Sequence, residues 1–238
     1  ACSIGIAYFP DDGEDPSILL KAADISLYSA KENGKNHYAF YRAELTQKAE
    51  YRFQIEQSLR EAIENQELSL VYQPQINIET GEIFGAEALS RWFHPQLGQV
   101  PPGDFIATAE RIGMNKTLTE WVLQTACSQL VAWKKQGFKA LRMAVNISPS
   151  LFLDQEFVRL VKRIIDEAGI APAELELEVT EGIVQTDPRN LIVFQDLKDL
   201  GVLLSIDDFG TGYSSFASLK HLMVDYLKID KYFIDDML

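Results

Sequence analysis

Acidic and amide side chains follow several apolar runs of this chain. Five runs end in such groups: Glu87, Asn146, the glutamates around Glu178, the pair Asp207-Asp208, and Lys228-Ile229-Asp230. Carboxylate and amide oxygens suit hard divalent ions such as Mg²⁺ and Mn²⁺, and no set of histidines or cysteines at ligand spacing competes with them. Two adjacent aspartates can serve two ions about 3.5–4 Å apart, an arrangement that activates water against a phosphodiester. The residue types therefore indicate metal-dependent phosphodiester hydrolysis.

Two cationic side chains accompany the acids. Lys228 can orient an attacking water or balance negative charge, and Arg91, two residues after Leu89, has the fork geometry that holds a phosphate. Each signal alone is weak, because an isolated acid more often caps a helix, an isolated asparagine more often belongs to a turn, and an isolated lysine is more often solvated. Only their convergence on one face supports a site.

Alternating strands and helices would produce that convergence. The expected strands are 68–78, 83–91, 141–147, 175–180, 202–206 and 226–229, and the expected helices are 105–113, 117–136, 155–168 and 189–200. This order is typical of a parallel sheet, closed or doubly wound. In the runs 141–147 and 202–206 both the odd and the even positions are apolar, as strands buried on both faces require. In a parallel α/β barrel all strand C-termini lie on one face. We expect the five groups to meet there.

The chain before residue 67 has a different pattern. A strand is expected at 2–8, a helix at 17–33 and a second strand at 37–41. Apolar residues at helical spacing, without proline or glycine, then predict a helix over 42–66 that links this region to the next domain.

Composition limits the classes of partner. The chain has 238 residues, of which 47% are apolar, and 35 acidic residues against 22 basic ones give a net charge of −13. This charge disfavours a nucleic-acid polymer or an anionic membrane surface as partner. No apolar run approaches the roughly 18 residues that span a bilayer, and the two cysteines suggest no disulfide framework. We expect a cytoplasmic protein, and the start at Ala1 suggests a fragment.

Taken together, the motifs resemble those of the EAL family of cyclic-di-GMP phosphodiesterases. In chain order they are Tyr72-Gln73-Pro74, Glu87-Ala88-Leu89 with Arg91, Asn146-Ile147-Ser148, Glu178-Val179-Thr180-Glu181, Asp207-Asp208-Phe209-Gly210-Thr211-Gly212 and Lys228-Ile229-Asp230. The resemblance runs from about Leu59 to Leu238. It implies an α/β fold with a TIM-like (β/α)₈ barrel that opens cyclic-di-GMP to linear pGpG, using two Mg²⁺ or Mn²⁺ ions.

The resemblance also assigns roles by motif position. The metal ligands would be Glu87, Asn146, Glu178, Asp207 and Asp208, with Asp207 bridging the ions. The catalytic group would comprise Glu87, Asp208, Lys228 and Asp230, of which the last two would position the water. The substrate contacts would be Gln73, Leu89, Arg91 and Asn146. Glu181 would steady the loop after Asp207-Asp208. In the family that loop also contributes to dimerisation, which implies a homodimer through this domain.

The opening segment resembles the end of a GGDEF domain, the diguanylate cyclase type. The matching residues are Ser3-Ile4-Gly5-Ile6-Ala7, Ala23-Asp24, Leu27-Tyr28, Ala30-Lys31 and Gly34-Lys35-Asn36. The expected organisation is therefore a partial α+β GGDEF tail at 1–41, a helical linker at 42–58 and an EAL domain at 59–238. The GGDEF signature is expected upstream of Ala1, beside a sensory domain of the parent protein. The last barrel strands are expected beyond Leu238, because a barrel left open exposes strand edges.

Three functions remain open at this point, the last of them a structural or interaction fragment that binds no nucleotide. The first is hydrolysis of cyclic-di-GMP in bacterial signalling. The alternative is a catalytically impaired EAL domain that acts as a cyclic-di-GMP receptor or interaction module. Degenerate receptors usually lose a ligand or the lysine, and this sequence keeps each one that falls within its range, which favours the enzyme.

Overall fold

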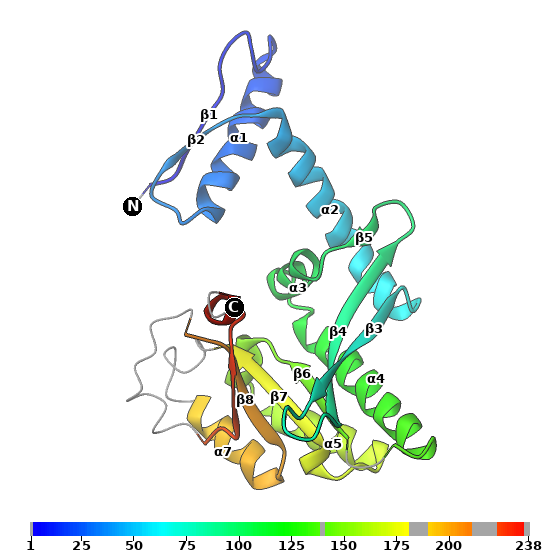
Figure 1. Cartoon of the computed structure of the whole chain (residues 1–238). Helices are drawn as coiled ribbons and strands as arrows, with labels where there is room; N and C mark the ends of the chain where they lie inside the picture. Colours follow the sequence, from blue (N-terminus) through cyan, green and yellow to red (C-terminus); the bar gives the residue numbers. More distant parts are fainter. Residues whose placement is uncertain (1, 139–140, 181–189, 211–222, 236–238) are drawn as a thin grey trace. The chain divides into compact units, whose positions relative to one another are not determined.

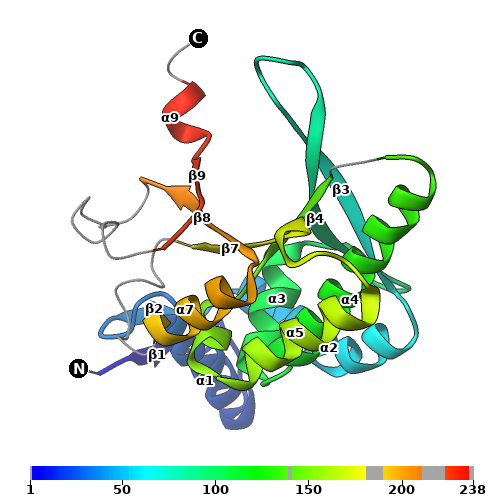
Figure 2. The same ribbon diagram turned by 90° about the horizontal axis from the view of Figure 1, so that it is seen from below.

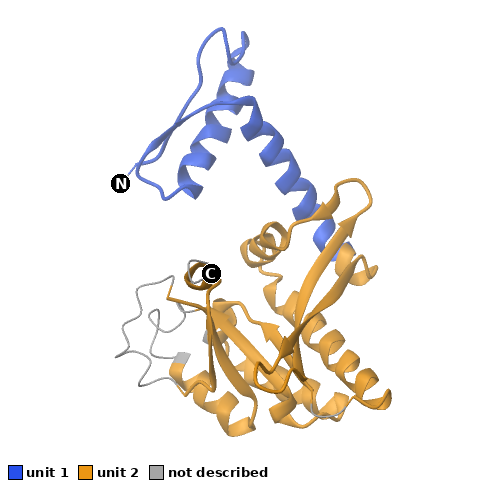
Figure 3. Ribbon diagram, viewed as in Figure 1, with its two compact units in different colours: residues 1–61 blue, residues 62–238 orange. Residues whose placement is uncertain are grey.

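A computed structural model describes residues 2–138, 141–180, 190–210 and 223–235 (Figure 1). The chain divides into two compact units, Ala1–Glu61 and Ala62–Leu238, which are coloured separately in Figure 3. Helix α2 (Ala43–Glu64) begins in the first unit and ends in the second. No helix in the described ranges combines the length and the apolarity that crossing a membrane requires.

The first unit packs one helix against a small parallel sheet. Strand β1 (Ile4–Ile6) pairs with β2 (Tyr38–Phe40), and α1 (Pro16–Glu32) connects them. Asp15 caps α1 by accepting a hydrogen bond from the Ser17 amide at 2.7 Å. At Gly5 the strand touches the helix backbone so closely that a Cβ would stand 2.0 Å from the Ala23 carbonyl oxygen. Only glycine fits at this contact.

The second unit is built on one mixed sheet. Its strands are β3 (Leu68–Ile76), β4 (Ile83–His94), β5 (Gly98–Val100), β6 (Arg142–Asn146), β7 (Leu175–Thr180), β8 (Leu203–Phe209) and β9 (Tyr226–Ile229). The order is β3-β4-β6-β7-β8-β9, and β5 pairs with β4. The β3 and β5 strands run antiparallel to β4, and the pairs from β4 to β9 are parallel. Among the described strands this sheet is open, so a closed barrel is not seen.

Helices cover one face of this sheet. They are α3 (Pro102–Arg111), α4 (Asn115–Lys135), α5 (Glu156–Ala168) and α7 (Asn190–Leu200). The short α9 (Tyr232–Asp235) follows β9 and is not one of them, and 3₁₀ turns lie at Pro149–Leu153 and Pro172–Glu174. Figure 2 shows α4, α5 and α7 on the same side of the sheet. The α5 helix buries Phe157, Leu160, Val161, Ile164 and Ile165, a helical stripe that faces the core. Gly169, in the left-handed conformation, ends it.

Strand β7 shows how the two faces differ. Leu175, Leu177 and Val179 alternate with Glu176 and Glu178, and all five are buried. Because successive side chains of a strand point to opposite faces, the leucines and the valine share one face and the glutamates share the other. We call the second face the acidic face; it carries Glu176 and Glu178.

Several predicted boundaries were wrong, for local reasons. The strand predicted over 68–78 ends at Ile76, because the Asn77 side chain accepts hydrogen bonds from the amides of residues 79 and 80 and forms a turn. The helix predicted from 105 begins at Pro102, since proline suits a first helical turn. The first strand covers 4–6 rather than 2–8, β4 continues to residue 94 rather than 91, and β5 was not predicted. The helix α9 and the two 3₁₀ turns were not predicted either, and the remaining described elements lie within three residues of the predicted ranges.

Candidate active site

Sheet register brings the predicted residues onto the acidic face. Gln73 pairs with Glu87 across β3 and β4, Asn146 pairs with Glu178 across β6 and β7, and Asp207 pairs with Thr180 across β7 and β8. Glu87 also pairs with Ala144, two residues before Asn146. Paired residues share a face, so residues from five strands are directed to the same side. Asn146, Glu178 and Asp207 also lie toward the C-terminal ends of β6, β7 and β8, whereas Glu87, which was predicted to end its strand, lies inside β4.

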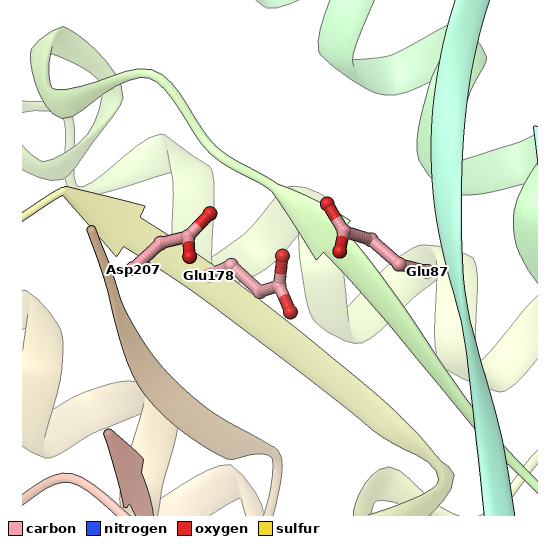
Figure 4. A group of neighbouring side chains, drawn as sticks. All are labelled: Glu87, Glu178 and Asp207. Atoms are coloured by element: carbon pink, nitrogen blue, oxygen red, sulfur yellow. The ribbon is translucent and has the colours of Figure 1, made fainter. Parts of the chain in front are cut away.

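Three carboxylates form the centre of this site. Each of Glu87, Glu178 and Asp207 offers an oxygen, and these three atoms lie within 4.8 Å of one another. Figure 4 shows the side chains of Glu87 and Asp207 directed toward Glu178. The exposed fractions of these side chains are 16%, 0% and 22% for Glu87, Glu178 and Asp207. Three like charges at such short range require a cation.

Lys228 supplies one positive charge. Its Nζ donates hydrogen bonds to Glu178 at 2.8 Å and to Glu87 at 3.0 Å, and it lies 3.3 Å from Asp207 Oδ1. Burial alone would lower the pKa of Lys228, but the hydrogen bonds and charges of Glu178 and Glu87 outweigh this effect and raise it. Lys228 therefore stays protonated among the three acids.

The charge balance remains negative despite this lysine. Burial raises the pKa of Glu178 above its ordinary value, and the charges of Glu87 and Asp207 raise it further, while Lys228 acts in the opposite direction. Burial also raises the pKa of Asp208, together with the charge of Asp207 and a hydrogen bond with Asp230. The raised pKa values show that these carboxyl groups do not all ionise easily at such short range. A bound cation would lower these pKa values and favour the charged carboxylates.

Asp207 and Asp208 occupy a bulge in β8. Residue 206 pairs with residue 227 and residue 209 with residue 229, so the two aspartates together oppose Lys228. Asp208 has φ 54°, in the left-handed region, and its amide donates to Asp207 Oδ1 at 3.0 Å. The predicted strand 202–206 was too short, because the aspartates belong to β8 itself.

The structure places the remaining predicted residues in different ways. Asn146 donates from Nδ2 to Glu87 Oε1 at 2.8 Å, within the cluster. Asp230 lies just after β9 and accepts from the Tyr232 amide at 2.6 Å. Gln73, Leu89 and Arg91 share the Glu87 side of the β3–β4 pair, and Arg91 donates to the Ser90 carbonyl at 2.8 Å. Glu181 lies outside the described residues.

The donor set fits a divalent cation. Carboxylate oxygens from three strands and an asparagine amide converge, and they are the hard ligands that Mg²⁺ and Mn²⁺ prefer. Glu178 Oε1 is buried and, within the part of the chain that the structure describes, has no hydrogen-bond partner. A metal ion would satisfy this atom, which Lys228 does not reach.

Comparison with known proteins identifies the family. The model of the EAL domain matches residues 56–238. The chain belongs to the EAL domain family. Residues 1–37 match the model of the diguanylate cyclase GGDEF domain, so an EAL domain follows a GGDEF segment here. The predicted resemblance to both families is confirmed.

The relatives of this EAL domain include proteins named as cyclic di-GMP phosphodiesterases. The bifunctional diguanylate cyclase/cyclic di-GMP phosphodiesterase MucR of Pseudomonas aeruginosa is 40% identical over 238 residues, which is 100% of this chain and 35% of MucR. The cyclic di-GMP phosphodiesterase PdeR of Escherichia coli is 36% identical over 238 residues, 100% of this chain and 36% of PdeR. The chain thus spans about a third of the length of these curated relatives.

A solved structure supports the same conclusion. The PaMucR phosphodiesterase in complex with c-di-GMP is 40% identical, with a TM-score of 0.73 over 77% of this chain and 75% of that one. The mixed α/β content predicted for the EAL domain is therefore shown.

Sequence reasoning did not identify three residues below the carboxylates on the acidic face. Ser205 pairs with Glu178 and has a buried Oγ without a hydrogen-bond partner among the described residues. Arg142 and Tyr226 lie on the same face, four and two residues before Asn146 and Lys228. The period of two along each strand would have found them, since residues at even offsets share a face.

Proposed function

We propose that this chain is the catalytic part of a cyclic-di-GMP phosphodiesterase that opens the cyclic dinucleotide to linear pGpG. The observation that carries this proposal is the convergence of Glu87, Glu178 and Asp207 around Lys228. The names of MucR and PdeR as cyclic di-GMP phosphodiesterases support the substrate. Hydrolysis in a bacterial signalling pathway follows from that substrate.

The proposed site holds two Mg²⁺ or Mn²⁺ ions. Glu87, Asn146, Glu178 and Asp207 would bind them, with Asp207 shared, and Asp208 would serve the second ion. When bound, the ions lower the pKa of a water and stabilise the leaving oxygen. A second cation beside Asp207 would also offset the burial and charge repulsion that raise the pKa of Asp208.

The remaining residues would orient substrate and water. Lys228, protonated within its three ion pairs, holds the acids in place and would help to position the water together with Asp230, which steadies Asp208 through their hydrogen bond. Gln73, Leu89 and Arg91 lie along the same face of β3 and β4, where they would contact the dinucleotide. Glu181 is proposed to steady the loop after Asp208.

The wider organisation is also a proposal. We infer a GGDEF end at 1–41, a linker at 42–58 and an EAL domain at 59–238 that forms a closed (β/α)₈ barrel in the parent protein. The parent would act in the cytoplasm, receive its signal from an upstream sensory domain and dimerise through the EAL domain. Curvature supports closure, because side chains of β6 and β9 meet although two strands separate them.

Hydrolysis is the test. The 238-residue chain and a version extended with the parent's own residues are assayed for conversion of cyclic-di-GMP to pGpG with Mg²⁺ and with Mn²⁺. The variant Asp207→Asn should lose metal-dependent turnover, because it removes the shared carboxylate. The matched control is Asp154→Asn, which removes a surface carboxylate paired with Lys116 at 3.1 Å and should leave turnover unchanged. Unchanged activity in Asp207→Asn contradicts the metal assignment.

A receptor is the second candidate function. Tight binding of cyclic-di-GMP without turnover in either protein, measured with Ca²⁺ and with Mg²⁺, would favour this reading. The Lys228 cluster argues against it, since a receptor needs no lysine among its carboxylates.

A further inference from the structure

Arg142 reaches across the acidic face from β6 to β9. Its guanidinium carbon lies 4.4 Å from the centre of the Tyr226 ring and 4.7 Å from that of Phe84. Two strands, β7 and β8, separate β6 from β9 in the sheet. The contact therefore joins two segments that no backbone hydrogen bond connects directly, and a cation held between two aromatic rings is attracted to both.

Glu176 holds Arg142 from a third side. The Arg142 Nη1 atom lies 3.8 Å from Glu176 Oε2, and the exposed fractions of the two side chains are 20% and 4%. A carboxylate this deeply buried needs a positive partner. Glu176 belongs to β7, two residues before Glu178, so the guanidinium is fixed to the same strand that carries the central carboxylate.

Strand β9 pairs with β8 on one side only among the described strands, and its Lys228 contacts the three carboxylates. It has four residues, it is the last strand in the described sheet, and Tyr226, Leu227 and Ile229 are 42%, 43% and 61% exposed. At its start Asp225 holds β8 by accepting from the Leu204 amide at 2.8 Å and pairs with Lys198 at 2.6 Å. That contact fixes where β9 begins, but it lies three residues before Lys228.

Tyr226 fixes β9 on the side where Lys228 acts. The two residues are separated by one position, so both side chains lie on the acidic face. If the Tyr226 ring moved away from Arg142, only the pairing with β8 and the Asp225 contact would position β9, and the Lys228 ammonium would be held less firmly against Glu87, Glu178 and Asp207.

We propose that Arg142 is a positioning residue: held by Glu176 and lying over Tyr226, it keeps β9 where Lys228 contacts all three carboxylates. Its importance for turnover rests on the proposed function, whereas the placement of Lys228 does not. Arg142 itself touches none of the predicted metal ligands through the hydrogen bonds and ion pairs of the described residues, so it acts through Tyr226 and Lys228.

The first readout is the reactivity of Lys228. The whole chain is treated with a limiting amount of an N-hydroxysuccinimide acetate, and acetylation of each lysine is measured by mass spectrometry. Lys162 of α5, 60% exposed, serves as the internal reference. In Arg142→Met and Tyr226→Leu the labelling rate of Lys228 should rise about three- to tenfold, the range that loss of one cation–π contact supports. Arg142→Lys and Tyr226→Phe keep a cation and a ring, and should stay near the parent rate.

The second readout is turnover. In Arg142→Met and Tyr226→Leu, kcat for cyclic-di-GMP should fall by a similar factor while KM changes less than about twofold, because ground-state contacts to the dinucleotide remain. The double variant should be no worse than Arg142→Met, since the contact between Arg142 and Tyr226 is already lost in that single variant, which also removes the contacts of Arg142 with Phe84 and Glu176. Circular dichroism checks folding; if Arg142→Met does not fold, Tyr226→Leu, which alters a half-exposed ring, carries the test.

The outcomes separate this inference from the proposed function. If no protein turns over cyclic-di-GMP but Lys228 labelling rises in the two disruptive variants, the positioning role stands and the proposed function fails. If Lys228 is labelled at the parent rate in both disruptive variants, or equally fast in Tyr226→Phe, the positioning role is overturned whatever the turnover.

Discussion

Replacing Lys228 by methionine tests whether the carboxylate cluster is a cation site. The substitution keeps much of the side-chain volume but removes the charge that contacts three acids, leaving Glu87, Glu178 and Asp207 within 4.8 Å of one another. Breaking a fully buried ion pair costs about 3–5 kcal/mol, while exposed pairs contribute about 0–1 kcal/mol. Because the Lys228 side chain is 26% exposed, we expect an intermediate loss.

A loss of about 2–3 kcal/mol gives a measurable shift. For a unit of 150–250 residues, 1 kcal/mol changes Tm by about 2–4 °C, so Lys228→Met should lower Tm by about 4–12 °C in EDTA. Mg²⁺ or Mn²⁺ should then raise Tm more in the variant than in the parent, because a divalent ion replaces the missing charge. Differential scanning calorimetry with and without metal measures both effects.

The control is another lysine ion pair. Lys116 and Asp154 lie 3.1 Å apart with side chains 44% and 40% exposed, so Lys116→Met should change Tm by no more than about 2–4 °C. Equal Tm values for Lys228→Met and the parent in EDTA would refute the electrostatic reasoning. Absence of any metal-dependent stabilisation in either protein would refute the cation site.

Two further predictions concern packing. Gly5→Ala places a Cβ 2.0 Å from the Ala23 carbonyl oxygen, so we expect the first unit to lose about 1–3 kcal/mol or more of its unfolding free energy, measured with urea. The control Gly103→Ala places a Cβ with nothing within 4 Å and should be nearly neutral. Equal stability of the two variants would contradict the close contact at Gly5. Burial raises the pKa of Cys127 to about 12. At pH 8 a disulfide reagent should therefore modify only the exposed Cys2 in the native protein, and should modify Cys127 only after denaturation. Rapid modification of Cys127 in the native protein would contradict its burial.

Much of the site followed from strand patterns. Asn146, Glu178 and Asp207 could be predicted to meet because each lies near the end of an apolar strand, and parallel strands align their C-terminal ends. Glu87 was predicted to join them, although it lies inside β4 and not at its end. The order of strands and helices was also readable, since buried strands such as β7 have apolar residues at every second position.

The rest depended on contacts between distant segments. The contact between Arg142 and Tyr226 exists only because the sheet curves, and no local pattern encodes that curvature. Likewise, the three ion pairs of Lys228 depend on where β9 docks. The β5 strand was missed because three residues with a glycine give no detectable alternation.

The left-handed conformation of Asp208 influences how this domain can evolve. Asparagine and glycine adopt positive φ readily, and both are reached from aspartate by a single base change, whereas β-branched residues would strain the backbone. Mutation can therefore remove the charge beside Asp207 while β8 keeps its shape. The backbone therefore permits a descendant protein that keeps the fold and the ligand pocket but has lost catalytic activity. Selection for turnover, rather than for folding, must maintain the Asp208 carboxylate.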